Sequence, residues 1–185
     1  MNKSGDSIRV VHPLFPVEGE GSIPISPLQF NIHQCSLEIA KDLNRLWHSS
    51  LPEYRTGFMP ISIICFCAEY KNRYYASAIW NNPSSPSLVK KPWLELRRMA
   101  IACDAPKNTA SRMIKIMTII INKKFPRIEK LISYQDTSIH RGTIYKASGW
   151  SKGNRSKQIK LRNGKFRKQI TNKISYPKIR WEKIL

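Results

Sequence analysis

The spacing of apolar and polar residues predicts alternating helices and strands along most of this chain. In residues 35–47, apolar side chains recur every three or four positions, which is typical of an amphipathic helix. Residues 61–70 and 73–80 are rich in β-branched and aromatic residues, and they flank the polar pair Lys71-Asn72. Two such runs joined by a short polar step predict a β-hairpin.

A third strand and a long helix are predicted beyond a loop rich in Pro, Asn and Ser. The strand covers residues 94–102, and apolar residues with a helical period run from 113 to 121, so the helix ends before Pro126. The turn between them brings a helix N-terminus to the edge of a sheet. Free backbone N–H groups and the helix dipole favour anions there, so we expect a nucleotide or coenzyme pyrophosphate at this turn.

A further strand and a short helix complete the patterned region. Residues 130–135 have the composition of a strand. Asp136 or Thr137 is a suitable N-cap for a helix that continues through Lys146, and Gly149 is a suitable C-terminal cap.

Composition divides the chain into three parts. Residues 1–27 are rich in Pro, Gly and Ser and are expected to form an extended arm, residues 28–150 contain the patterned core, and residues 151–185 form a basic tail. Within the tail, residues 158–169 have Asn163-Gly164 at their centre, which predicts a hairpin with a two-residue turn.

The charge of the chain indicates a polyanionic partner. Its 185 residues have a formal net charge of +20, and the tail carries twelve Lys or Arg and one acid. A run of lysines is often only a solvated surface, but this excess is larger than solubility requires. We therefore expect the tail to follow nucleic-acid phosphates. The residues expected to bind DNA are Arg155, Lys157, Lys160, Arg162, Lys165, Arg167 and Lys168.

Other features argue against secretion and membrane insertion. The longest apolar run, ISIICFC, has the length of a strand, and the N-terminus lacks the basic and then apolar pattern of a signal peptide. Cys35, Cys65, Cys67 and Cys103 have the spacing of neither a zinc site nor a disulfide framework. We expect reduced, mostly buried thiols in a cytoplasmic protein.

Two stretches resemble the GNAT N-acetyltransferases: LELRRMAIACDAPKNTASRM (94–113) and LISYQDTSIHRGTIYKASGW (131–150). The resemblance implies an α/β (α+β) fold with a mixed, mostly antiparallel sheet flanked by helices. It also implies acetyl-coenzyme A, or a related acyl donor, bound by its pyrophosphate at the turn. Residues 107–111 replace the Arg/Gln-x-x-Gly-x-Gly/Ala loop of that family. The residues expected to bind the cofactor are Ala102, Lys107, Asn108, Thr109, Ser111 and Arg112.

A narrower resemblance is to the bacteriophage Mom-type adenine modification proteins. It rests on RRMAI, APKNTASRM, residues 131–150 and the ending KIRWEKIL, with a weaker match around LWHSSLP. The resemblance implies a transferase that converts adenine in DNA to an N6-carbamoylmethyl form and so protects phage DNA from host restriction enzymes. The partners would be DNA and a small-molecule donor, without a membrane, and the sequence leaves a homodimer open.

Four residues are candidates for the chemistry, each with a structural alternative. Arg98 would orient a carbonyl or phosphate, or it forms an ion pair with Glu95. Asp136 would act as a general base or anchor the adenine amino group, or it caps a helix. Tyr145 would protonate a thiolate leaving group, or it is a core tyrosine, and Ser111 would bind phosphate or cap a helix. Glu95, expected on the opposite face of the strand from Arg98, is an alternative base.

A metal site is a further possibility that the Mom-type resemblance implies. His48 follows the first predicted helix, where a histidine commonly interacts with the helix dipole. With Asp136 and His140 it would instead form a histidine-carboxylate site for iron.

Three functions remain open from the sequence. The first is modification of adenine at N6 in DNA. The second is an N-acetyltransferase that acts on a protein or small amine and has a tail that binds RNA or DNA. The third is a basic DNA-binding protein without catalytic activity.

Overall fold

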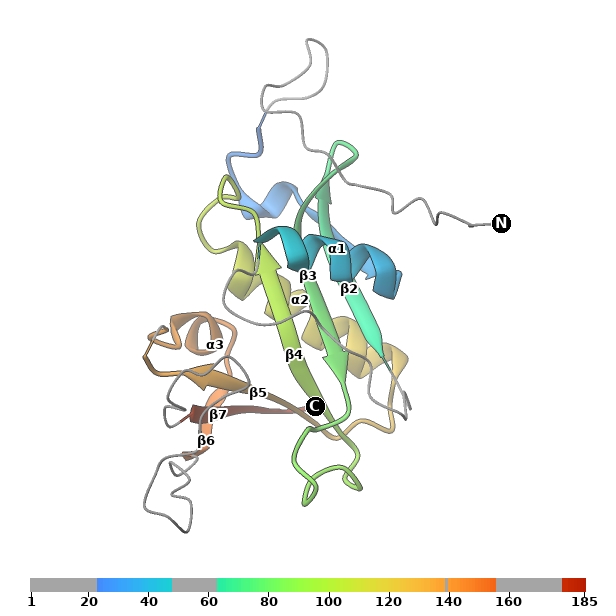
Figure 1. Cartoon of the computed structure of the whole chain (residues 1–185), viewed down its shortest axis with the longest axis vertical. Coiled ribbons are helices and arrows are strands. Elements are labelled where there is room, and N and C mark those ends of the chain that lie inside the picture. Colours follow the sequence, from blue (N-terminus) through green and yellow to red (C-terminus); the bar gives the residue numbers. More distant parts are fainter. Residues whose placement is uncertain (1–22, 48–62, 139, 156–177) are drawn as a thin grey trace, which may run out of the picture.

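The computed structural model describes residues 23–47, 63–138, 140–155 and 178–185. In these ranges the chain forms a seven-stranded sheet in the order β1-β2-β3-β4-β5-β7-β6. Only β4 and β5 pair in parallel. The mixed, mostly antiparallel sheet flanked by helices, which the resemblance implied, is therefore confirmed (Figure 1). Of the helices in these ranges, none is long and apolar enough to cross a membrane.

From α1 to α3 the elements follow the predicted order of strands and helices, and η1 and β1 before them and β6 and β7 after them are additional. Their bounds are η1 Pro27–Gln29, β1 Asn31–Cys35, α1 Leu37–Trp47, β2 Ile64–Tyr70, β3 Arg73–Asn81, β4 Trp93–Ile101, α2 Thr109–Lys124, β5 Lys130–Asp136, α3 Thr143–Ala147, β6 Ser151–Arg155 and β7 Lys178–Ile184.

Two turns form where the sequence predicted them. Lys71 and Asn72 both have positive φ, at 47° and 63°, which is the backbone of a two-residue primed turn between β2 and β3. Gly149 has φ +75° just beyond α3. There Trp150 N–H donates to the Tyr145 carbonyl (3.0 Å) and Gly149 N–H donates to the Lys146 carbonyl (3.0 Å). These two bonds form a Schellman motif, so the predicted C-terminal cap is confirmed.

Strands β4 and β5 form a fork. They pair only from Trp93 with Lys130 to Leu96 with Ser133, and they are not paired beyond these residues. Just after Leu96, the register of β4 against β3 shifts at a bulge that contains Arg97. A bulge bends its strand and increases the local twist, so it helps to direct β4 away from β5.

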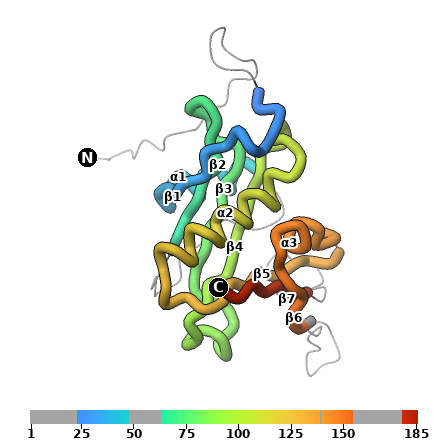
Figure 2. Tube along the Cα trace, turned by 180° about the vertical axis from the view of Figure 1, so that it is seen from behind, coloured from blue at the N-terminus to red at the C-terminus, as the bar shows by residue number. Residues whose placement is uncertain are grey.

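Helices cover the two faces of the sheet differently (Figures 1 and 2). One face packs against α2, through core residues that include Trp80, Leu94 and Met117, all fully buried. On the other face α1 packs over β2, β3 and β4, where Ala40 contacts Ile79. We call these the α2 side and the α1 side.

An aromatic layer lies on the α2 side, near the fork. We define it as Trp80, Tyr145, Trp150 and Trp181. Tyr145 stacks on Trp181 with 5.4 Å between ring centroids, and Trp150 lies 5.8 Å from Tyr145 and 6.2 Å from Trp80. All four are buried. Burial of such large rings contributes several kcal/mol to the free energy of folding, so this layer holds α3 against the sheet.

The predicted helix that starts at Asp136 or Thr137 was wrong, because α3 begins only at Thr143. The side chain of Asp136 instead accepts hydrogen bonds from Ser138 N–H (2.9 Å) and Ser138 Oγ (2.5 Å), which form an Asx turn. Gly142, with φ +73°, precedes the helix. The first helix was predicted to begin at residue 35, but residues 31–35 form an edge strand and α1 begins at Leu37.

The sheet continues beyond residue 150. Strand β7 lies between β5 and β6, and Trp181 of β7 is only 1% exposed. Residues 151–155 and 178–185 thus complete the core, whereas most of the predicted arm, residues 1–22, and the predicted hairpin, residues 158–169, lie outside the described residues. Of the four free thiols, those of Cys65 and Cys67 are buried, Cys35 is partly exposed and Cys103 is exposed.

Candidate functional site

The first turn of α2 has the backbone of an anion site. Asn108 precedes the helix in a left-handed conformation, with φ 68°, and its side chain makes no capping hydrogen bond. Asparagine adopts this conformation more easily than most residues, so the turn does not require the glycine of the usual loop. The hydroxyl groups of Thr109 and Ser111 donate to the carbonyls of Pro106 (2.6 Å) and Asn108 (3.0 Å). The positive end of the helix dipole therefore remains available for an external anion.

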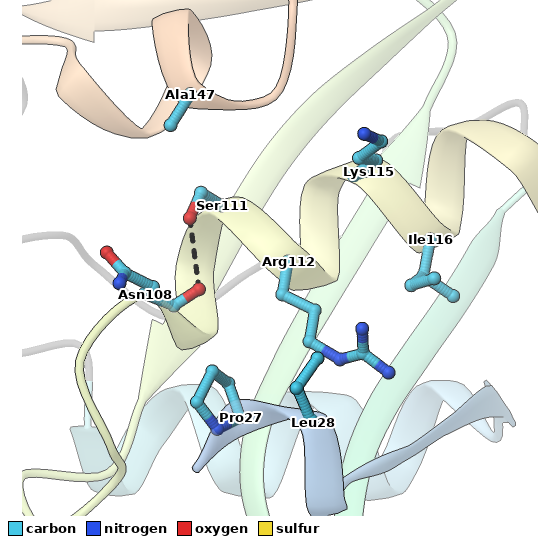
Figure 3. Close-up of a pocket in the computed structure, with 8 residues that line it drawn as sticks. All are labelled: Pro27, Leu28, Asn108, Ser111, Arg112, Lys115, Ile116 and Ala147. Carbon is cyan, nitrogen blue, oxygen red and sulfur yellow. Dashed lines mark hydrogen bonds between the residues drawn. The ribbon is translucent and has the colours of Figure 1, made fainter.

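A crevice of about 260 Å³ lies beside this turn (Figure 3). Its walls come from η1, α2 and α3. The hydroxyl of Ser148, at the end of α3, donates to the Ser111 carbonyl at 2.9 Å and so ties α3 to the first turn of α2. The lining residues are Pro27, Leu28, Asn108, Ser111, Arg112, Lys115, Ile116 and Ala147.

Two cations make this crevice attractive to phosphate. The side chain of Arg112 extends along the crevice beside Leu28 (Figure 3). Its Nε is buried and has no hydrogen-bond partner. An unpaired buried donor is costly, and an anionic oxygen would satisfy it. Lys115, one turn further along α2, is exposed at the same crevice.

The six residues expected to bind the cofactor are placed in two groups. Asn108, Ser111 and Arg112 line the crevice, whereas Ala102, Lys107 and Thr109 are not lining residues. The N–H of Ala102 donates to the Tyr75 carbonyl (2.9 Å), and Thr109 is buried. Lys107 is exposed in the turn itself.

Tyr145 lies at the closed end of the fork, on the α2 side. Its hydroxyl is 2.9 Å from Ser133 Oγ, and Ser133 Oγ also donates to the Leu96 carbonyl at 3.3 Å. These are the last paired residues of β4 and β5. Burial raises the pKa of the Tyr145 phenol, while the hydrogen bond to Ser133 opposes the rise. The phenol is therefore protonated at neutral pH.

Arg98 and Asp136 lie on the two arms of the fork and face the α1 side. Arg98 pairs in register with Ile79, which packs under α1. Asp136 is the last residue of β5, and its backbone is in register with that of Lys178 in β7. Because register partners share a face, the alternation along both strands places these two side chains on the side opposite to Tyr145.

Glu95 was predicted on the opposite face from Arg98, and this was wrong. Glu95 pairs with Asn81 and Arg98 pairs with Ile79, so the bulge at Arg97 brings both to the α1 side. Glu95 is 5% exposed, and its carboxylate accepts from Ser84 N–H (2.7 Å) and Ser84 Oγ (2.9 Å). Glu95 forms an ion pair with Arg97 of the same strand, with 3.4 Å between Arg97 Nε and Glu95 Oε1.

The α1 side of β4, β5 and β7 carries a network that we call the charged face: Trp93, Glu95, Lys130, Tyr134, Arg180 and Glu182. Glu182 accepts from Lys130 Nζ at 2.9 Å and from Arg180 at 2.6 Å. Burial tends to raise the pKa of Glu182, but these hydrogen bonds outweigh it and hold the pKa below its usual value. Burial also raises the pKa of Tyr134, which is hydrogen-bonded to Arg180.

The described residues do not fit the predicted iron site. They contain no group of three His, Cys, Asp or Glu side chains able to hold a metal ion. Asp136 Oδ1 is bound by Ser138, His140 is exposed, and His48 lies outside the described residues. No chemistry is therefore assigned to a metal.

Sequence reasoning missed three parts of the site. Pro27 and Leu28 reach the crevice from more than eighty residues away, and no local pattern marks them. Ser133 was read only as part of a strand, although its position at the fork connects Tyr145 to β4. Lys115 has helical spacing from Ser111, so the helix pattern alone would have placed it beside the anion site.

Solved structures identify the class of this fold. A Bacillus subtilis acetyltransferase in complex with CoA superposes with a TM-score of 0.55 at 14% identity, over 84% of this chain and 99% of that one. The ribosomal-protein-S18-alanine N-acetyltransferase from Escherichia coli gives 0.53 at 13% identity, over 84% and 93%. A GNAT family acetyltransferase from Elizabethkingia anophelis with acetyl-CoA bound gives 0.51 at 14% identity, over 85% and 99%. The chain therefore has the fold of the GNAT acetyltransferases.

The family model of the Mom protein family matches residues 64–183. The chain thus belongs to the Mom protein family, as the sequence resemblance indicated. The matched range includes the fork, the turn before α2 and the charged face. A search of the curated proteins gave no match.

Proposed function

We propose that this protein is an acyltransferase-like enzyme that modifies adenine at N6 in DNA and uses an acyl-coenzyme A or a related donor. The observation that carries the proposal is the fork between β4 and β5, with a phosphate-ready crevice and a buried phenol on one side and Arg98 and Asp136 on the other. Membership of the Mom protein family supports DNA as the acceptor and carbamoylmethyl as the group added.

The donor side is supported by the residues at the crevice. The first turn of α2, Arg112 and Lys115 would bind the phosphate groups of a coenzyme. Two of the superposed acetyltransferases contain CoA or acetyl-CoA, which supports the same class of donor here. When bound, such a donor supplies an activated carbon and a thiolate leaving group. An acyl thioester would leave an amide on N6, whereas the carbamoylmethyl product requires a related donor in which the sulfur is bonded to the methylene carbon of a carbamoylmethyl group, so that the C–S bond breaks as the C–N bond forms.

The chain's own residues would manage the protons at the fork. Tyr145, whose raised pKa keeps it protonated, would hold a proton at its phenol oxygen for the leaving sulfur. Asp136, with Oδ1 fixed by Ser138, would accept the proton that the adenine amino group loses. Arg98 would orient the group being transferred from the same side as Asp136. The target base would leave the stack, because its amino group is poorly accessible in a duplex.

The experiment is mass spectrometry of nucleosides from DNA of cells that express the chain. We expect a new deoxyadenosine species with the mass of a carbamoylmethyl adduct. Asp136→Asn should reduce its yield by about a hundredfold, because removal of a general base costs about that factor. Ser138→Ala is the matched control, since it loosens the Asx turn but leaves the carboxylate in place.

The rival functions give other results in the same cells. Unmodified nucleosides together with an acetylated protein or amine would support an ordinary N-acetyltransferase. Unmodified nucleosides, no acetylated product and retained DNA binding would support a non-catalytic DNA-binding protein. Either result would reject the proposed modification of adenine.

A further inference from the structure

Three cations surround one exposed edge of the charged face. The ammonium groups of Lys91 and Lys130 lie 4.6 and 4.4 Å from the centroid of the Trp93 ring, and the Arg180 guanidinium lies at 5.8 Å. Around the Trp93 ring the carboxylate is Glu182, which pairs with Lys130 and Arg180. The other carboxylate of the charged face, Glu95, is buried and pairs with Arg97. Lys91 is exposed. The cluster therefore has an excess of positive charge held in fixed positions.

This excess continues to the open end of the fork. Lys178 lies two residues before Arg180 on the same face of β7. Its backbone is in register with that of Asp136 at the end of β5. Cations thus extend along β7 from the site of the expected chemistry to the Trp93 cluster.

No described helix covers this part of the sheet on the α1 side (Figures 1 and 2). Helix α1 packs on β2, β3 and β4, whereas α2 and α3 lie on the other side. The side chains of Lys130 and Arg180 keep 22% and 17% of their surface exposed although both are ion-paired. A polyanion could therefore approach the cluster, and the pairing with Glu182 would orient the cations for it.

We propose that the charged face, together with Lys91, binds the sugar-phosphate backbone of the DNA beside the modified base. The inference rests on the proposed function, which supplies DNA as the partner. The geometry suits it, because Trp93 and Leu96 are three residues apart on β4, or about 10 Å, which is about three nucleotide steps along a duplex from the fork. The donor would bind on the α2 side and the DNA on the α1 side, and they would meet at the fork.

Salt-dependent binding of the full chain to a labelled 20-base-pair duplex, without donor, tests this surface. The test variant is Lys91→Gln with Lys130→Gln, and the control is Lys123→Gln with Lys124→Gln at the end of α2, which removes the same charge from the other side of the sheet. Loss of two phosphate contacts lowers the log–log salt slope by about 1.8. Between 50 and 200 mM salt, the test variant should therefore lose about tenfold less affinity than wild type, whereas the control should retain most of the wild-type slope.

Each outcome decides the proposal. Equal slopes for wild type and test variant, or equal reductions in test variant and control, would overturn the surface even if DNA remains the substrate. Wild type that prefers phosphatidylglycerol vesicles or an acidic peptide over the duplex would instead contradict the proposed partner. Since Lys130→Gln breaks the pair with Glu182, Lys91→Glu on the exposed loop provides a second test, with the same expected direction and an unchanged melting temperature.

Discussion

The two sides of the fork each contain a tryptophan, but the surroundings of the two rings differ. On the α2 side, Trp181 is buried against Tyr145 and its Nε1 donates to Gln135 Oε1 at 2.8 Å. On the α1 side, Trp93 is only half-buried and is surrounded by cations. The aromatic layer therefore stabilises the fold, while the charged face keeps polar groups at the surface. The comparison shows that large rings are packed rigidly on the α2 side, whereas the α1 side keeps its charged groups accessible around a half-buried ring.

The largest expected effect comes from replacing one tryptophan on each side of the fork by alanine. Trp181→Ala should lower the free energy of unfolding by about 3–5 kcal/mol, because it leaves a cavity against Tyr145 and removes the partner of Gln135. Trp93→Ala should cost about 1 kcal/mol, since its ring is partly exposed. Urea unfolding of both variants measures the difference. Equal losses would remove the distinction between the two sides.

A pair of glycines tests how tightly the aromatic layer is packed. Gly142 and Gly149 both have positive φ, but a Cβ at Gly142 would lie 2.5 Å from Gln135 Oε1 and 2.7 Å from the Trp181 ring, whereas a Cβ at Gly149 would meet nothing within 4 Å. Gly142→Ala should cost about 3 kcal/mol and Gly149→Ala about 1 kcal/mol. Thermal unfolding compares them. Similar costs would mean that backbone strain alone, and no close packing, limits position 142.

The smallest expected effect concerns the Glu182 carboxylate of the charged face. A lowered folded-state pKa means that Glu182 stabilises the protein above its usual pKa and that this stability is lost as the pH falls through the folded value. Wild type should exceed Glu182→Gln by about 1 kcal/mol at pH 7, and the two should converge as the pH falls through the lowered pKa of Glu182. Melting temperatures measured from neutral to acidic pH provide the comparison. A difference that does not shrink as the pH falls would assign the effect to packing.

Local patterns predicted the elements that local forces form. The turn at Lys71-Asn72, helix α2 and the cap at Gly149 all depend on neighbouring residues, and the structure confirms each. The start of α3 was mispredicted because Asp136 has two short-range options, a helix cap and an Asx turn, and tertiary contacts of the following loop decide between them. Gln135 takes part in this choice, since its amide donates to the His140 carbonyl.

The site was predictable only as far as single strands and helices define it. Asn108, Ser111 and Arg112 were predicted from their place at the start of a helix, and all three line the crevice. The shared face of Glu95 and Arg98 could not be predicted, because a bulge depends on pairing with a strand twenty residues away. The charged face combines β4, β5 and β7 and therefore has no signature in any one stretch of sequence.

The hydrogen bond from Ser148 to the Ser111 carbonyl has a mechanical meaning. The same hydroxyl lies 2.6 Å from the Ile144 carbonyl within α3, so its one proton is shared between a carbonyl of α3 and a carbonyl of the helix that would bind the donor's phosphates. The gap between these helices is therefore set before any ligand arrives, and widening it would break a bond worth about 1 kcal/mol. The bond favours one spacing of the two helices, and the distance of a bound donor from the phenol would depend on that spacing.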